Sequence, residues 1–151
     1  MQVNIYIETE NQIMRRQLHR YGYVISTMHK GQEVTVSGFG ETDDTCKGTL
    51  VTAIAAAVQR LRGSCELHIH VRDGWIAQMV RSLQEWAGKD FKRGSGEPVT
   101  HAETWAEIFA RMQALQIEQV ETETGRHEYS SWIQSEIKRR IMESQNAAGL
   151  A

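Results

Sequence analysis

The sequence has few of the features that would assign it to a specialised class. It has two cysteines and one proline in 151 residues, and Cys46 and Cys65 belong to no CxxC pair. This spacing predicts neither a disulfide framework nor a zinc cage. No stretch approaches the roughly 18 to 20 apolar residues of a membrane span, and the opening MQVNIYIETE lacks the basic start of a signal peptide. We therefore expect a cytoplasmic protein with no membrane partner.

A large excess of charge of one sign is also missing. Seventeen Lys and Arg residues stand against nineteen Asp and Glu residues, which gives a formal net charge of −2. Domains that bind nucleic acid through their overall charge are usually basic, so any such surface must be local here. With 40% apolar residues, a chain of this length can bury a core as a single domain.

The hydrophobic pattern predicts an α/β domain. Alternating or short apolar stretches predict five strands, at 2–9, 21–28, 33–39, 65–71 and 116–121. Helical spacing predicts helices at 45–62, 74–86, 100–115 and 128–142. This order implies a mixed sheet of three antiparallel and then two parallel strands, flanked by helices. We expect one domain over 1–144 and a disordered tail over 145–151.

Several motifs between residues 3 and 141 together resemble ribonuclease H of the HI type. The stretch IYIETEN resembles the family's opening strand with its acidic residue, here Glu8. GTLVTAIAAAVQRL is similar to the first long helix, and HIHVRDGWIAQMV to the fourth strand running into an acidic residue, here Asp73. WAGKDFKRGSGEPVTHAETW resembles the basic protrusion, and RHEYSSWIQSEI the loop histidine and last helix. The resemblance implies a ribonuclease H-like fold.

The resemblance also implies a two-metal site, from which this sequence departs. In the family, four carboxylates hold two magnesium ions that activate the attacking water and stabilise the leaving oxygen. Glu8 and Asp73 match two of these positions, but Thr49 and Gln134 stand where the other two carboxylates are expected. A hydroxyl and an amide offer oxygen atoms without the missing charge. We therefore predict an incomplete site that binds Mg²⁺ or Mn²⁺ weakly if at all.

Two parts of the site prediction stay open. Nearby acids replace the missing ligands if the register differs by a turn, and the candidates are Asp43, Asp44, Glu128 and Glu136. His127 lies on the loop that, in the family, carries a histidine assisting proton transfer or product release. An imidazole suits that task because its pKa lies near neutrality. A surface loop histidine with no catalytic role is the equal alternative.

Four other side chains have a simpler interpretation. Trp105 and Trp132 occupy amphipathic helical positions, so we expect both to anchor the core. His68 and His70 point to one face of a strand, an arrangement that binds transition metals in other proteins. Because no third ligand lies at a useful spacing, we expect partly buried histidines with hydrogen-bond partners instead.

The segment after the second predicted helix is the best candidate for binding nucleic acid. Basic side chains there can neutralise phosphates, while aromatic ones either pack the loop or lie against sugars; they are Trp86, Lys89, Phe91, Lys92 and Arg93. In the family, the matching element grips the DNA strand of a hybrid, so the resemblance implies an RNA/DNA hybrid or duplex as partner. Asp90 and Glu97 dilute the charge, and a solvated loop is the alternative.

Three functions are compatible with these observations. We expect a ribonuclease H-like nucleic-acid-binding domain with weak or absent hydrolysis. The alternatives are an active Mg²⁺-dependent endoribonuclease acting on RNA/DNA hybrids, and a protein-interaction module that kept the fold. Affinity that falls steeply with salt separates the first from the third, and metal-dependent cleavage identifies the second.

Overall fold

The computed structural model describes residues 1–150. Within them one mixed sheet has the strand order β3-β2-β1-β4-β5. Its strands are β1 (Gln2–Thr9), β2 (Gln17–His29), β3 (Gln32–Asp44), β4 (Glu66–His70) and β5 (Val120–Glu123). The first three strands pair antiparallel, whereas β4 lies parallel to both β1 and β5. The expected five-stranded mixed sheet is confirmed.

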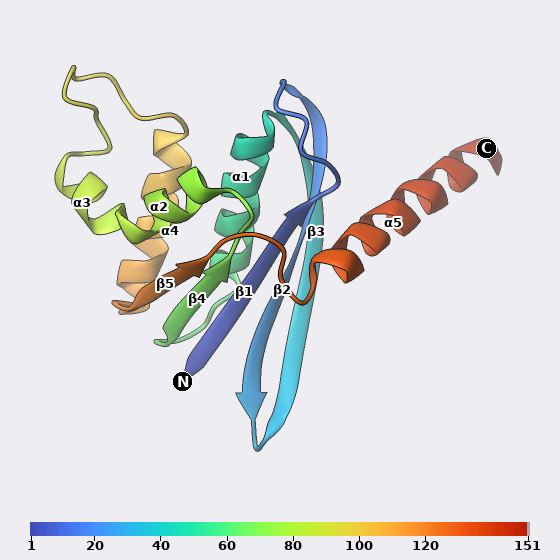
Figure 1. Cartoon of the computed structure of the whole chain (residues 1–151), viewed down its shortest axis with the longest axis horizontal. Helices are drawn as coiled ribbons and strands as arrows, with labels where there is room; N and C mark the ends of the chain where they lie inside the picture. Colours follow the sequence, from blue (N-terminus) through green and yellow to red (C-terminus); the bar gives the residue numbers. More distant parts are fainter. Residues whose placement is uncertain (151) are drawn as a thin grey trace.

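Helices cover both faces of this sheet. The described residues form α1 (Cys46–Gln59), α2 (Gly74–Arg81), α3 (Leu83–Gly88), α4 (Ala102–Ala114) and α5 (Ser130–Leu150). The first four lie on one side of the sheet, where α1 and α2 contact strands and α4 packs on α1. Helix α5 crosses the other face over β1 and β2 before it leaves the body of the molecule (Figure 1). None of the described helices is long and apolar enough to cross a membrane.

The alternation of β1 decides which side chains enter the main core. Val3, Ile5 and Ile7 face α1 and are buried, and each such aliphatic side chain stabilises the fold by about 1.5–3 kcal/mol. Tyr6 and Glu8 point to the other face, beneath the start of α5. The same strand therefore builds the core on one side and supplies the carboxylate on the other.

Several element boundaries differ from the sequence prediction. Strand β2 begins at Gln17 instead of Tyr21, and β3 ends at Asp44 instead of Phe39. The helix expected over 74–86 is two helices, because the chain leaves helical geometry at Ser82. The fifth strand lies at Val120–Glu123 instead of 116–121. The N–H of Ile117 bonds the Met112 carbonyl at 2.8 Å and Gln116 has a φ of 57°, so these residues close α4.

The last helix is also longer than expected. It continues to Leu150, so residues 145–150 are helical where we expected a disordered tail, and Ala151 lies outside the described residues. The side chains from Met142 to Gly149 are exposed. Good helix formers such as Met142, Glu143 and the Ala147–Ala148 pair favour continued helix even without a packing partner.

The parallel pairing of β1 and β4 positions the candidate site. Tyr6 of β1 lies opposite His70 of β4, so both strands end at the same edge of the sheet. Helix α1 begins at this edge after its N-cap Thr45, whose Oγ1 accepts a hydrogen bond from the Gly48 amide at 3.1 Å. In an α/β sheet, the carboxyl ends of the strands are where side chains from several elements converge.

Candidate functional site at the carboxyl ends of β1 and β4

Glu8 lies in a closed arrangement of protein donors. Its side chain is 2% exposed, and Arg72 Nε donates to its Oε1 at 3.0 Å. The hydroxyl of Ser130, at the start of α5, donates to Oε2 at 2.5 Å. Both carboxylate oxygens are therefore satisfied by the chain itself, and the negative charge is balanced by a guanidinium.

Asp73 has the same kind of arrangement one strand away. Lys47 Nζ lies 2.9 Å from Oδ2 and 3.2 Å from Oδ1. Asp73 is also the N-cap of α2, because its Oδ1 accepts the Ile76 amide at 3.0 Å. Burial alone raises the pKa of Asp73, but the Ile76 amide and the Lys47 ammonium together bring it below its ordinary value. Asp73 thus caps a helix and forms an ion pair.

The two substituted family positions lie outside this arrangement. Thr49 is fully buried, and its hydroxyl donates to the Thr45 carbonyl at 2.8 Å within the first turn of α1. Gln134 accepts from Arg126 at the surface, at 3.5 Å. The residue of α1 that reaches Asp73 is Lys47, and the residue of α5 that reaches Glu8 is Ser130. Neither was singled out from the sequence.

His127 has both ring nitrogens engaged in structural bonds. Nε2 lies 2.9 Å from the Ile7 carbonyl, and Nδ1 accepts the Tyr129 amide at 3.2 Å. This pairing assigns the neutral ring with its proton on Nε2. Glu8 Oε2 is 3.5 Å away, yet burial lowers the pKa of His127, which the Ile7 and Glu8 contacts only partly oppose. The ring fixes the β5–α5 loop to β1.

The donor set does not fit a pair of magnesium ions. No group of three or more His, Cys, Asp and Glu side chains within residues 1–150 is placed to hold a metal. The two acids predicted as ligands, Glu8 and Asp73, each face a cation already. Two metal ions would add four positive charges to a site that is neutral without them.

The four nearby acids do not complete the set either. Asp43 and Asp44 lie near Arg16, at 3.8 and 4.0 Å, and Glu128 accepts the Tyr6 hydroxyl at 2.6 Å. Glu136 forms an ion pair with Arg139 at 2.6 Å on the surface of α5. Each acid therefore has a partner of its own.

The protrusion-like segment, residues 86–93, presents its basic side chains to solvent. Lys89 lies 5.4 Å from the centre of the Trp86 ring, and both Lys89 and Lys92 are more than half exposed. Phe91 is buried against Phe109, so it packs the loop. Lys89 lies 3.9 Å from Glu85 and Lys92 lies 3.7 Å from Asp90. These exposed ion pairs reduce the positive potential of the loop but do not cancel it.

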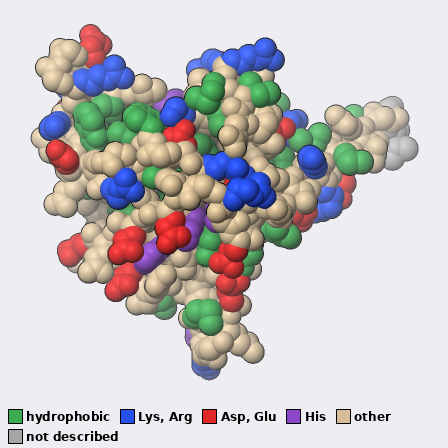
Figure 2. Space-filling model, in the orientation of Figure 1, with side chains coloured by type: hydrophobic (Ala, Val, Ile, Leu, Met, Phe, Trp, Pro, Cys, Tyr) green, Lys and Arg blue, Asp and Glu red, His purple; other side chains and the backbone are tan. Residues whose placement is uncertain are grey.

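The histidine pair of β4 has the partners expected for a structural role. His70 Nε2 is 2.9 Å from Asn4 Oδ1, its ring stacks on Tyr6, and its Nδ1 faces Glu123 at 3.4 Å. His68 faces Glu121 at 3.5 Å. Figure 2 shows histidines flanked by acidic side chains on this face of the sheet. The arrangement is a cross-strand ladder between β4 and β5.

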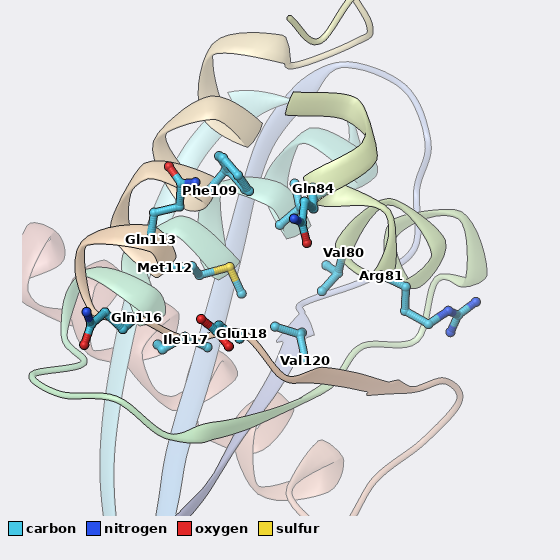
Figure 3. Close-up of a pocket in the computed structure, with 11 residues that line it drawn as sticks. Val80, Arg81, Gln84, Phe109, Met112, Gln113, Gln116, Ile117, Glu118 and Val120 are labelled. Atoms are coloured by element: carbon cyan, nitrogen blue, oxygen red, sulfur yellow. The ribbon is translucent and has the colours of Figure 1, made fainter. Parts of the chain in front are cut away.

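A groove of about 720 Å³ with a mixed apolar and polar lining lies apart from the carboxylates of Glu8 and Asp73. It is bounded by α2, α4 and β5, and Val80 and Met112 point toward the same space from facing helices (Figure 3). Three glutamines line its rim, with one Arg and one Glu. Nothing in its lining resembles a catalytic or metal-binding set.

Sequence comparison relates the chain to ribonucleases H. No protein-family profile matches it. Over 98 residues it is 26% identical to "Ribonuclease HI" of Xylella fastidiosa strain Temecula1, covering 64% of this chain and 65% of the relative. A "Ribonuclease H" of Xanthomonas campestris is 24% identical over the same coverage. The matched region thus spans just under two thirds of these relatives.

Structural comparison extends over more of the chain. A foamy viral protease-reverse transcriptase solved with dsDNA has a TM-score of 0.62 at 15% identity, covering 88% of this chain and 89% of that one. A type 1 ribonuclease H with the type 2 active-site motif has a TM-score of 0.63 at 15% identity, covering 83% of this chain and 64% of that one. The fold is ribonuclease H-like, as expected.

Proposed function

We propose that this chain, a divergent ribonuclease H-like protein, binds nucleic acid without two-metal hydrolysis. The observation that carries the proposal is the replacement of metal charge by protein charge. Arg72 lies on Glu8 and Lys47 on Asp73, at 3.0 and 2.9 Å. A metal ion would have to displace both cations, and within residues 1–150 no group of three His, Cys, Asp or Glu side chains is placed to hold it.

An RNA/DNA hybrid or duplex is the nucleic acid that we propose as partner. The sequence relatives are named ribonuclease H, and two of the similar foamy viral structures were solved with dsDNA and with an RNA/DNA hybrid. Lys89, Lys92 and Arg93 on the exposed loop supply contacts to phosphates, and the half-buried Trp86 holds the loop in place. Phe91 contributes only through packing.

Binding without metal has a measurable signature. If Lys47 and Arg72 take over the positive charge that metal ions supply in the family, affinity for a hybrid does not depend on Mg²⁺. Affinity still falls with salt, because each phosphate contact releases counterions. Mg²⁺ or Mn²⁺ therefore changes binding only as any salt does, by screening.

The test is a fluorescence-anisotropy titration of a labelled RNA/DNA hybrid, with dsDNA and dsRNA in parallel, in EDTA and in Mg²⁺ or Mn²⁺. We expect similar affinities in both conditions at matched ionic strength and an unchanged hybrid on a denaturing gel. The double variant Lys89→Glu/Lys92→Glu should bind roughly tenfold more weakly. Lys138→Glu, a single reversal at an exposed position of α5, and Lys138→Glu/Arg140→Glu, a matched double reversal, are the controls.

Two outcomes would contradict the proposal. The first is metal-dependent cleavage that disappears in both Glu8→Gln and Asp73→Asn, because it would show that the two acids work as ligands. The second is the absence of binding to all three nucleic acids at low salt, which would leave only the fold in common with the relatives. Circular dichroism of each variant shows whether a lost signal reflects loss of folding.

A further inference from the structure

A second charged concavity lies at the opposite end of α1 from the candidate site. It is a groove of about 930 Å³ lined by the end of α1, the end of α4 and the neighbouring faces of β2 and β3. Three arginines line it, Arg60, Arg62 and Arg111, over an apolar floor of Ile25, Val36 and Leu115. Its size lies within the range of about 300–1,000 Å³ that is typical of ligand sites.

Two of the arginines are held in place by the protein. Arg60 Nη1 donates to the Ser37 carbonyl at 3.0 Å and to the Tyr23 hydroxyl at 3.3 Å. Arg111 Nη2 donates to the Leu61 carbonyl at 2.6 Å. These partners are neutral, so they orient the guanidinium groups without cancelling their charge. Preorganised charges of this kind bind a ligand with less loss of side-chain entropy.

The groove keeps its positive charge. None of the described residues that line it is acidic, and none of its arginines forms an ion pair with a described carboxylate. The helices α1 and α4 both end here, and each carboxyl terminus carries about half a negative charge. Three guanidinium charges exceed that sum, which leaves a net charge of about +2.

We propose that this groove docks a short acidic segment of a partner protein that also carries apolar side chains. Carboxylates of the segment would pair with the three guanidinium groups, because the N–H donors of each guanidinium match the two oxygens of a carboxylate. The apolar side chains would cover the floor, where Val36 is 41% exposed. The phosphate backbone of a nucleic acid offers the charge but no aliphatic side chain for this floor, so the observations favour a peptide.

The groove is separate from the site proposed for nucleic acid. Helix α1 has 14 residues, so its two ends are about 20 Å apart. Lys47 in the first turn of α1 reaches Asp73, whereas Arg60 and Arg62 follow its last turn. The carboxylate site and the groove therefore lie at opposite ends of α1. The peptide proposal does not depend on nucleic-acid binding.

The experiment uses a short fluorescent peptide in which Asp residues alternate with Leu and Ser. Arg62→Glu is the main variant because Arg62 is exposed. The hydrogen bonds that orient the arginines of the groove belong to Arg60 and Arg111, so this substitution leaves them intact. We expect it to weaken binding about tenfold, and Lys138→Glu to change it less than about twofold. Val36→Ser should weaken binding by roughly threefold, because it removes apolar contact at an exposed position.

Control ligands decide between the possible occupants. Replacing Asp by Asn in the peptide should abolish binding, and replacing Leu by Ser should weaken it. The proposal is overturned if the Asn peptide binds as well as the Asp peptide, or if Arg62→Glu binds like the wild type. It is also overturned if a single-stranded DNA binds with the same sensitivity to Arg62→Glu while the acidic peptide does not bind.

Discussion

The two ends of helix α1 use the same kinds of residue in opposite ways. At its amino end, two cations face two carboxylates, Lys47 on Asp73 and Arg72 on Glu8. At its carboxyl end, three arginines face carbonyls, a hydroxyl and open space. The first end is neutral and closed, and the second is charged and open.

This difference shows why charge alone does not identify a functional site. In the family that this chain resembles, the carboxylates at the strand ends serve the ligand. Here the same carboxylates form hydrogen bonds and ion pairs with the chain itself, so removing one partner should destabilise the fold. The arginines at the other end have no acidic partner among the described residues, which leaves their charge available to a ligand. Mutations at the amino end should therefore lower the free energy of unfolding. Removing Arg62 at the carboxyl end should leave that free energy nearly unchanged.

The largest effect is expected for Glu8→Ala. Glu8 is 2% exposed and Arg72 22%, so the substitution leaves a largely buried guanidinium without its carboxylate. Breaking one partner of such a pair should lower the free energy of unfolding by about 3 kcal/mol. Urea unfolding followed by circular dichroism measures the loss.

A double-mutant cycle tests the cause of this loss. Glu8→Ala/Arg72→Ala should recover part of the stability, because it removes the unpaired charge together with its partner. If the double variant is as unstable as the sum of the single variants, Glu8 does not act through Arg72.

A smaller effect is expected for Asp73→Ala. The substitution removes the side-chain cap of α2 and the partner of Lys47, whose ion pair is partly exposed. Loss of an N-cap costs about 1 kcal/mol, and a partly exposed pair adds less than that, so we expect about 1–2 kcal/mol. Asp73→Asn keeps a capping oxygen and should retain most of the stability, whereas an equal loss in both variants would assign the effect to the ion pair.

Acid should also destabilise the fold through groups around the candidate site at the amino end of α1. The arginines at the carboxyl end should contribute nothing to this pH dependence. Burial lowers the pKa of His127 and of His70, so folding favours their neutral forms. That stabilisation is complete above the ordinary histidine pKa of about 6.5 and is lost as the pH falls through the lower folded values. Asp73 adds a second loss below about pH 4, because its folded pKa is also lowered.

Thermal unfolding between about pH 7.5 and about pH 5 measures the histidine contribution. This range brackets the ordinary histidine pKa of about 6.5. The melting temperature of the wild type should fall with pH, and His127→Gln should show a shallower dependence with a lower plateau. His29→Gln, at an exposed position of β2, is the control and should follow the wild type. If the melting temperature of His127→Gln depends on pH as steeply as that of the wild type, His127 does not contribute to the pH dependence.

The fold was largely predictable because its elements carry strong patterns. The alternation of Val3, Ile5 and Ile7 is the one that the buried face of β1 requires, and the wide apolar face of α1 matches its burial. Boundaries were less predictable where no side chain marks them, as at Ser82. Trp132 was expected in the core but is 44% exposed. It lies one residue from the stripe of Ile133 and Ile137, and one residue rotates a helical side chain by about 100°.

The sequence pointed to the acids of the candidate site but not to the cations that face them. The residue types at positions 8 and 73 are visible in the sequence, and Arg72 stands next to Asp73 as a possible signal. However, Arg72 pairs with Glu8, 64 positions away, and Lys47 with Asp73, 26 positions away. Such pairs arise only when β1, β4 and α1 meet. Ser130 was missed for the same reason, since it reaches Glu8 from the start of α5.

The smallest effect on stability is expected for Arg62→Ala at the carboxyl end of α1. Arg62 is exposed and lies beyond the last turn of the helix, so its removal should change the free energy of unfolding by less than about 0.5 kcal/mol. Arg72→Ala, the same substitution at the other end, leaves Glu8 buried without its cation and should cost several times more. Parallel urea titrations of the two variants compare the ends directly. Equal losses would mean that the Arg62 guanidinium also serves the fold, and its charge would then not be available to a partner.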